Sequence, residues 1–179
     1  LEKKKKMQVN LEKEKIYEKV KDKKEFLPDV NNNFGVIAML NGEKEDALYY
    51  FNQALDYNPV HLVALTNRGL LYLDNGLYRR AYDDLKHALE LSSEDPHILM
   101  AFGLAQRGIG LYDEAEKTFV KLIGHREGLY NLGLLYYEDY RNWKKAAATF
   151  KQYLKSGKTL GKLDLARIYY KRAKEKMLH

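Results

Sequence analysis

The chain of 179 residues has no cysteine, which excludes a disulfide framework, a cysteine-ligated zinc site and a thiol nucleophile. It has three prolines, and no apolar run reaches the about 18 residues that a membrane-spanning helix needs. Residues 1–6 are basic but lead into no apolar stretch, so we expect no signal peptide within the sequence itself. With 45% hydrophobic and 31% charged residues, the chain can bury a core and fold.

Charge is divided unevenly along the chain. Residues 1–27 carry 10 basic and 6 acidic side chains, residues 28–140 carry 9 and 17, and residues 141–179 carry 12 and 2. A basic end of this kind can bind nucleic acid or a membrane surface, although a solvated, lysine-rich end cap explains it more simply. A third interpretation is that the basic end contacts the acidic middle part of a second copy.

Three kinds of residue recur at a step of 34 positions, which indicates an internal repeat. The three series are Gly35, Gly69 and Gly103; Ala47, Ala81 and Ala115; and Phe51, Leu85 and Phe119. A fourth unit has one more residue between its glycine and its alanine, and its members are Gly133, Ala146 and Phe150.

Each unit reads as two helices joined by a short turn. In the first unit, apolar residues at helical spacing precede and follow the break at Asn41-Gly42. Small residues belong where two helices cross closely, so we expect Gly35 to face Ala47. We expect Phe51 to fill the gap to the next helix.

This pattern resembles the tetratricopeptide repeat, a 34-residue helix pair with the signature W-x₂-L-G-x₂-Y…A-x₃-F…P. The resemblance covers roughly residues 28–156. The closing proline is present only at Pro59, and the fourth unit, with a longer turn at residues 138–143, is also similar to the related Sel1-like variant. The signature tryptophan is replaced throughout, by Asn31, Leu65, Leu99 and Leu129.

The resemblance implies an all-α fold, a right-handed α-solenoid of about four helix–turn–helix repeats with capping helices. The implied repeats are residues 28–61, 62–95, 96–125 and 126–157. Residues 1–27 are expected to be a basic N-terminal helix or extension, with a helix over 7–26 that caps the first repeat, projects freely or folds into the groove. Residues 158–179 are expected to be a C-terminal capping helix, with Leu165, Ala166 and Tyr169 in the leucine, glycine and tyrosine places.

No catalytic or metal-binding pattern stands out. The five histidines are scattered without metal-ligand spacing, and no glycine-rich phosphate loop or nucleophile motif occurs. We therefore expect no enzyme activity, no cofactor and no metal.

The resemblance implies a partner-binding groove on the concave side, lined by the first helix of each repeat. In the family the groove residues flank the Leu-Gly step. Carried onto this sequence, they are Asn32, Val36 and Met39 in the first repeat; Thr66, Asn67, Leu70 and Leu73 in the second; Met100, Leu104 and Arg107 in the third; and Tyr130, Asn131, Leu134 and Tyr137 in the fourth.

The lining is more apolar than charged, which favours an amphipathic helix or hydrophobic segment as the partner. It disfavours the subtype that clamps an acidic C-terminus, because that needs two or three cations and Arg107 is the one available. Asn67 and Asn131 either contact the ligand or hold the neighbouring helix. The apolar residues, alternatively, belong to the core between helices.

The sequence therefore predicts a non-catalytic scaffold or adaptor that binds a partner protein or peptide, plausible in a bacterial multiprotein assembly. Self-assembly through charge-complementary ends is the alternative, and nucleic-acid binding by the basic C-terminal helix is less favoured. The compartment stays open: cytoplasmic, or periplasmic and envelope-associated if a leader was removed.

Overall fold

The computed structural model describes residues 2–92, 94–157 and 165–178, which form a row of helices with no strand among them. The α-helices are α1 (Glu2–Val20), α2 (Leu27–Leu40), α3 (Lys44–Tyr57), α4 (Leu62–Asp74), α5 (Tyr78–Leu91), α6 (Pro96–Gly108), α7 (Tyr112–Lys121), α8 (Arg126–Leu134), α9 (Trp143–Lys155) and α10 (Leu165–Lys176). A 3₁₀ turn, η1 (Lys24–Phe26), precedes α2, and a π-helical segment, η2 (Leu135–Asp139), extends α8. The predicted all-α class is confirmed.

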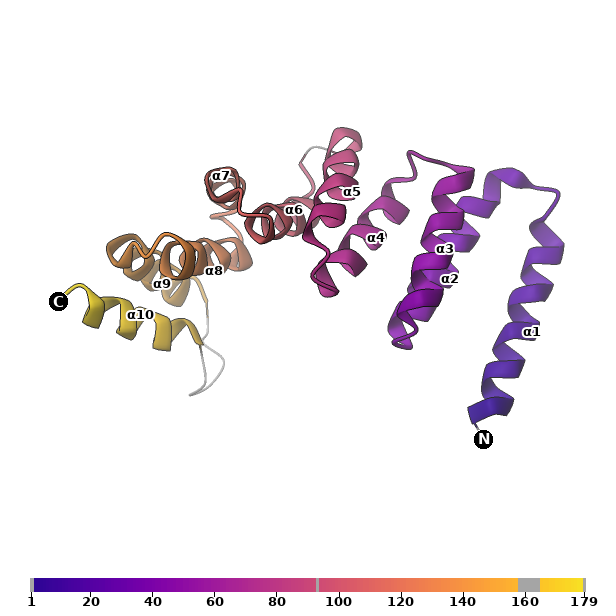
Figure 1. The fold of residues 1–179 in the computed structure, drawn as a ribbon, viewed down its shortest axis with the longest axis horizontal. Coiled ribbons are helices and arrows are strands. Elements are labelled where there is room, and N and C mark those ends of the chain that lie inside the picture. The colour runs from indigo at the N-terminus through magenta and orange to yellow at the C-terminus, as the bar shows by residue number, and fades with distance from the viewer. Residues whose placement is uncertain (1, 93, 158–164, 179) are drawn as a thin grey trace.

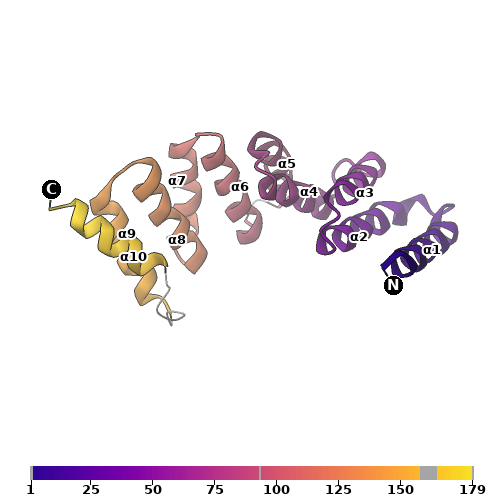
Figure 2. The ribbon, with the colours of Figure 1, turned by 60° about the horizontal axis from the view of Figure 1, so that its bottom comes forward.

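The helices pair in chain order, α2 with α3, α4 with α5, α6 with α7 and α8 with α9. Each first helix of a pair also contacts the first helix of the next pair, which strings the pairs into a solenoid with its two ends far apart (Figure 1). Seen from another side, the row is an arch with α2, α4 and α8 towards its inner side (Figure 2). This is the right-handed α-solenoid that the sequence predicts.

The recurring glycines lie where the two helices of a pair touch most closely. A Cβ atom on Gly35 would lie 2.5 Å from the ring of Phe51, and one on Gly103 would lie 2.5 Å from the ring of Phe119. The same contact joins Gly69 to Leu85 at 2.7 Å and Gly133 to Phe150 at 2.7 Å. The predicted close crossing is therefore present, but the side chain nearest to Gly35 is Phe51 and not Ala47.

The turns after α2, α4 and α6 share one geometry. Their glycines, Gly42, Gly76 and Gly110, have φ angles of 76°, 70° and 82°, the left-handed region that favours glycine. The amide of each next residue donates to the carbonyl five positions back, as in Glu43 N to Ala38 O at 2.9 Å. This is the Schellman arrangement that satisfies the last carbonyls of a helix.

The fourth pair accommodates its extra residue in the π-helical segment η2. The Tyr140 amide donates to Leu135 O at 3.0 Å, and the Asn142 amide donates to Tyr136 O, six positions back, at 2.8 Å. A π turn holds one more residue than an α turn, so Gly133 keeps its contact with Phe150 despite the insertion. In the turn after η2, the residue with left-handed backbone conformation is Arg141, whose φ is 51°. It is the one non-glycine residue with positive φ in the described part of the chain.

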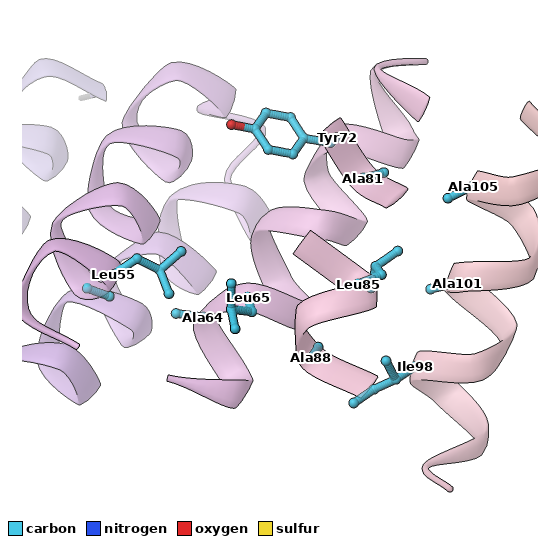
Figure 3. Close-up of a cluster of buried hydrophobic side chains, with 11 residues drawn as sticks. Leu55, Ala64, Leu65, Tyr72, Ala81, Leu85, Ala88, Ile98, Ala101 and Ala105 are labelled. Carbon is cyan, nitrogen blue, oxygen red and sulfur yellow. The ribbon is translucent and has the colours of Figure 1, made fainter. Parts of the chain in front are cut away.

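The core runs along the solenoid instead of closing within each pair. Figure 3 shows its central part, where side chains from α4 and α5 interlock with those of the neighbouring helices. The buried members are Ala54, Leu55, Ala64, Leu65, Tyr72, Ala81, Leu85, Ala88, Ile98, Ala101 and Ala105. Each pair therefore depends on its neighbours to cover its apolar faces, as expected for a repeat array.

Helix α1 lies at the N-terminal end of the row and contacts it through its second half. The Tyr17 hydroxyl donates to Oδ1 of the fully buried Asn31, and the Tyr17 ring lies 5.6 Å from the ring of Phe34. The Lys13 ammonium sits 4.7 Å from the ring centroid of Tyr50. Burial raises the pKa of Tyr17 to about 12. This end contact differs from an insertion of α1 into the groove, and the helix spans Glu2–Val20 instead of the expected 7–26.

Helix α10 packs against α9 at the other end. Its Ala166 and Ala173 are fully buried, and Tyr169 stacks on Phe150 with 5.5 Å between ring centroids. Leu165, which the sequence places at the leucine position of the repeat, is 55% exposed. The preceding part of the expected capping segment, 158–164, lies outside the described residues.

A valine at Gly103 is expected to lower the free energy of unfolding by about 1–3 kcal/mol, because its side chain would overlap the ring of Phe119. Urea unfolding followed by circular dichroism measures the change. Ala148→Val, at an exposed position of α9, is the control for β-branching in a helix. A Gly103→Val midpoint equal to that of the control would contradict the packing role of the glycine.

Backbone conformation predicts opposite effects at two equivalent turn positions. Gly76→Ala is expected to destabilise by about 1 kcal/mol, since φ of 70° strains an alanine although no atom lies within 4 Å of its Cβ. Arg141→Gly is expected to leave the stability unchanged or to raise it by a few tenths of a kcal/mol, because the same strain is relieved. Thermal melts of both variants test the pair, and equal losses of stability would rule out this account.

Candidate functional site

The predicted groove residues all lie on the first helices of the four pairs. Asn32, Val36 and Met39 are on α2, and Thr66, Asn67, Leu70 and Leu73 are on α4. The others are Met100, Leu104 and Arg107 on α6, Tyr130, Asn131 and Leu134 on α8, and Tyr137 in η2. We call the face that these residues share the inner face.

The inner face is only partly open to solvent. Leu70 is 40% exposed, whereas Asn32 is buried with 6% exposure, and the other predicted residues are half-buried. Met100, Leu104 and Leu134 pack against the C-terminal part of the core. Many of the predicted groove residues therefore also stabilise the contacts between helices.

The asparagines of the inner face join neighbouring first helices. Asn67 Nδ2 donates to Asn32 Oδ1 at 2.9 Å, which links α4 to α2. Asn131 Nδ2 donates to the Glu127 carbonyl at 2.9 Å and contacts Met100 Sδ at 3.4 Å, which links α8 to α6. Of the two roles considered for these amides, the contacts support holding the neighbouring helix.

The Arg107 side chain is paired with two carboxylates of the next repeat. Its Nε donates to Asp139 Oδ2 at 2.6 Å and its Nη2 to Glu138 Oε2 at 2.5 Å. Burial alone would lower the pKa of Arg107, but the two carboxylates hold it above its usual value. Its charge is thus neutralised within the chain, which strengthens the argument against a clamp for an acidic C-terminus.

Arg68, in contrast to Arg107, is directed away from the inner face. Its Nε and Nη2 donate to both carboxylate oxygens of Asp84 at 2.7 Å, and its Nη1 donates to Asn52 Oδ1 at 2.7 Å. Both partners belong to second helices, so this guanidinium ties α4 to α5 and α3.

The aromatic residues near the C-terminal end of the inner face contact one another. Tyr137 lies 5.2 Å from Trp143 and 5.0 Å from Tyr169, measured between ring centroids. Tyr130 lies 5.5 Å from Tyr153 in the same way. These side chains already have aromatic partners within the chain, so the more accessible apolar surface lies elsewhere.

The sequence analysis did not include two exposed residues of the inner face. Leu40 is 78% exposed and follows Val36 by four positions, and Val63 is 51% exposed and precedes Leu70 by seven. Residues at these spacings share one side of a helix. The helical period could have identified both, but the family pattern places groove residues close to the Leu-Gly step and so omits them.

The described residues contain no group of three or more acidic or histidine side chains that could hold a metal ion. No helix in that part of the chain has both the length and the apolar character needed to cross a bilayer.

The family model described as tetratricopeptide repeat matches residues 28–61 and 62–95. A curated relative, the BBSome complex member BBS4 of Bos taurus, is 30% identical over 81 residues, which are 45% of this chain. The chain spans 16% of the length of that relative.

Solved structures share the fold over more of the chain. MamA (residues 41 to the end) from Desulfovibrio magneticus RS-1 superposes with a TM-score of 0.69 at 20% identity and covers 72% of this chain and 75% of MamA. PilF of Pseudomonas aeruginosa superposes with a TM-score of 0.71 at 16% identity and covers 87% of this chain and 71% of PilF. Tetratricopeptide repeats generally form scaffolds for protein–protein interaction. The family model thus identifies residues 28–95 as two tetratricopeptide repeats, and the helix pairs that follow continue the same solenoid fold.

Proposed function

We propose that the protein is a non-catalytic adaptor that binds an apolar segment of a partner protein on its inner face. The observation that carries the proposal is the exposure of Leu40, Val63 and Leu70, three apolar side chains on the first helices α2 and α4. Exposed apolar side chains grouped on one face are typical of interaction sites.

The binding energy would come mainly from covering these side chains. Burying an exposed leucine fully is worth about 1.5–3 kcal/mol, so two or three anchors supply a useful affinity. Half-buried neighbours such as Val36, Met39 and Leu73 would complete the contact surface. Because the helices are already held by core packing, the surface is formed before the partner arrives, which reduces the entropic cost of binding.

The relatives support a role in assembly. BBS4 is named as a member of a complex, and the structural relatives MamA and PilF come from bacteria. We propose by analogy that this chain also serves a multiprotein assembly in a bacterium.

Leu70→Asp is expected to weaken binding of a groove partner by tenfold or more, since it places a charge in the apolar contact and loses about 1.5–3 kcal/mol of burial. The matched control is Leu91→Asp, on α5, where the leucine is 44% exposed. Partners are captured from cell extract on the immobilised chain and identified by mass spectrometry, and their affinity for each variant is then measured by calorimetry. Partners that bind both variants equally well would exclude the inner face.

Self-assembly through charged ends is a second candidate. The basic surface of α10 supports it, because its charge is opposite in sign to the net negative charge of residues 28–140. The exposed basic side chains of α10 include Arg167, Lys171, Arg172 and Lys174. Sedimentation velocity of the chain is expected to show larger species at ~50 mM salt than at ~500 mM salt, because salt screens contacts between exposed charges. A monomer at high protein concentration in both salts would exclude this function.

A further inference from the structure

We infer that the partner segment docks on α2 and α4 and carries lysine or arginine beside its apolar anchors, as a basic amphipathic helix does. This inference rests on the proposed function of the inner face. It adds where on the solenoid the partner segment docks and which sign of charge that segment carries, and the repeat pattern gives neither.

Along the first helices of the four pairs, the exposed large apolar side chains end at α4, since none lies on α6 or α8. The residue 34 positions after Leu40 is Asp74, on α4, and those 34 positions after Val63 and Leu70 are His97 and Leu104, on α6. Of these three only Leu104 is apolar, and it is half-buried. Asp74 closes α4 itself, so it forms the edge of the patch. We call Leu40, Val63 and Leu70 the anchor patch.

The arginines of α4 and α6 are already paired with carboxylates. Arg68 is paired with Asp84, and Arg107 is paired with Glu138 and Asp139. The guanidinium of Arg126 lies 4.1 Å from the ring centroid of Tyr153 on α9. None of these three guanidinium groups is therefore directed to an acidic partner on the anchor patch.

Carboxylates, in contrast, border the anchor patch. The side chain of Asp29, in the first turn of α2, is 69% exposed, with one oxygen 3.0 Å from His61 Nε2. The side chain of Asp74 is 69% exposed as well, and Lys44 donates to it at 2.7 Å. An apolar strip with acidic borders attracts an apolar segment with basic borders and disfavours an acidic one.

A second copy of this chain is the competing occupant, because residues 1–27 are basic and Met7 and Leu11 on α1 are 63% and 51% exposed. However, Lys13 and Tyr17 of α1 already contact α2 and α3 of their own chain. Docking α1 elsewhere would break these contacts, and for this reason we favour a separate partner.

Three synthetic peptides test the inference on the chain of 179 residues. The first is a helical peptide with leucine at every third or fourth position and lysine on its other side. The second replaces each lysine by glutamate, and the third has the composition of the first with its leucine stripe scrambled. In fluorescence anisotropy at low salt, the lysine peptide is expected to bind about tenfold or more tightly than either of the others.

Variants locate the binding. Leu70→Lys is expected to weaken the lysine peptide about tenfold or more, whereas Leu91→Lys on α5 leaves its affinity unchanged. The variant Asp29→Asn is expected to weaken it severalfold. Its control is Asp83→Asn, on α5, whose side chain is 62% exposed.

Each contrary result has a distinct meaning. If the glutamate peptide binds as tightly and Leu70→Lys tightens it, the inner face binds partners but the inferred charge is wrong. If the scrambled peptide binds equally well, the attraction is non-specific and the inference fails. If the chain alone forms oligomers that Leu70→Lys dissociates, the occupant is a second copy and the inference is wrong. If no peptide responds to Leu70→Lys and extract partners ignore Leu70→Asp, the proposed function fails too.

Discussion

The whole solenoid depends on one contact, a glycine of the first helix against a large apolar side chain of the second. In each of the four pairs a Cβ atom on that glycine would overlap the facing ring or leucine, at 2.5–2.7 Å. The missing side chain lets the two backbones approach, and the large side chain then reaches the next pair as well, as Phe51 does when it clusters with Leu71 of α4. Pairing and stacking thus depend on the same residue.

The period of these contacts is why the sequence predicts the fold so well. Gly35, Gly69 and Gly103 mark the helix crossings, and their spacing alone locates both helices of three pairs. The close contact of Gly35 with Phe51 was not predicted, because Ala47 is also small, and a sequence does not show whether two small residues meet or a small one meets a large one. The π turn in η2 could not be predicted either, because an inserted residue can equally lengthen a loop.

The inner face was predicted less completely, and the reason is physical. A polar side chain such as Asn67 or Arg107 has the same helical position whether it binds a partner or the next helix. Which contact it makes depends on acceptors more than 30 residues away, such as Asn32 Oδ1 and Asp139 Oδ2. The spacing of residues identifies a face of a helix. Which side chains on that face form hydrogen bonds or ion pairs within the chain depends on how the helix pairs stack.

Stacking divides the inner face into two parts with different roles. Towards the C-terminal end, the ion pairs of Arg107 join the third pair to the fourth, and the aromatic rings around Tyr137 join the fourth pair to α10. Towards the N-terminal end, Leu40 and Leu70 stabilise no comparable cluster and remain exposed. Because the scaffold there is complete without covering these side chains, their apolar surface contributes free energy only when another segment covers it. A repeat protein can in this way combine a rigid support with a binding surface on one row of helices.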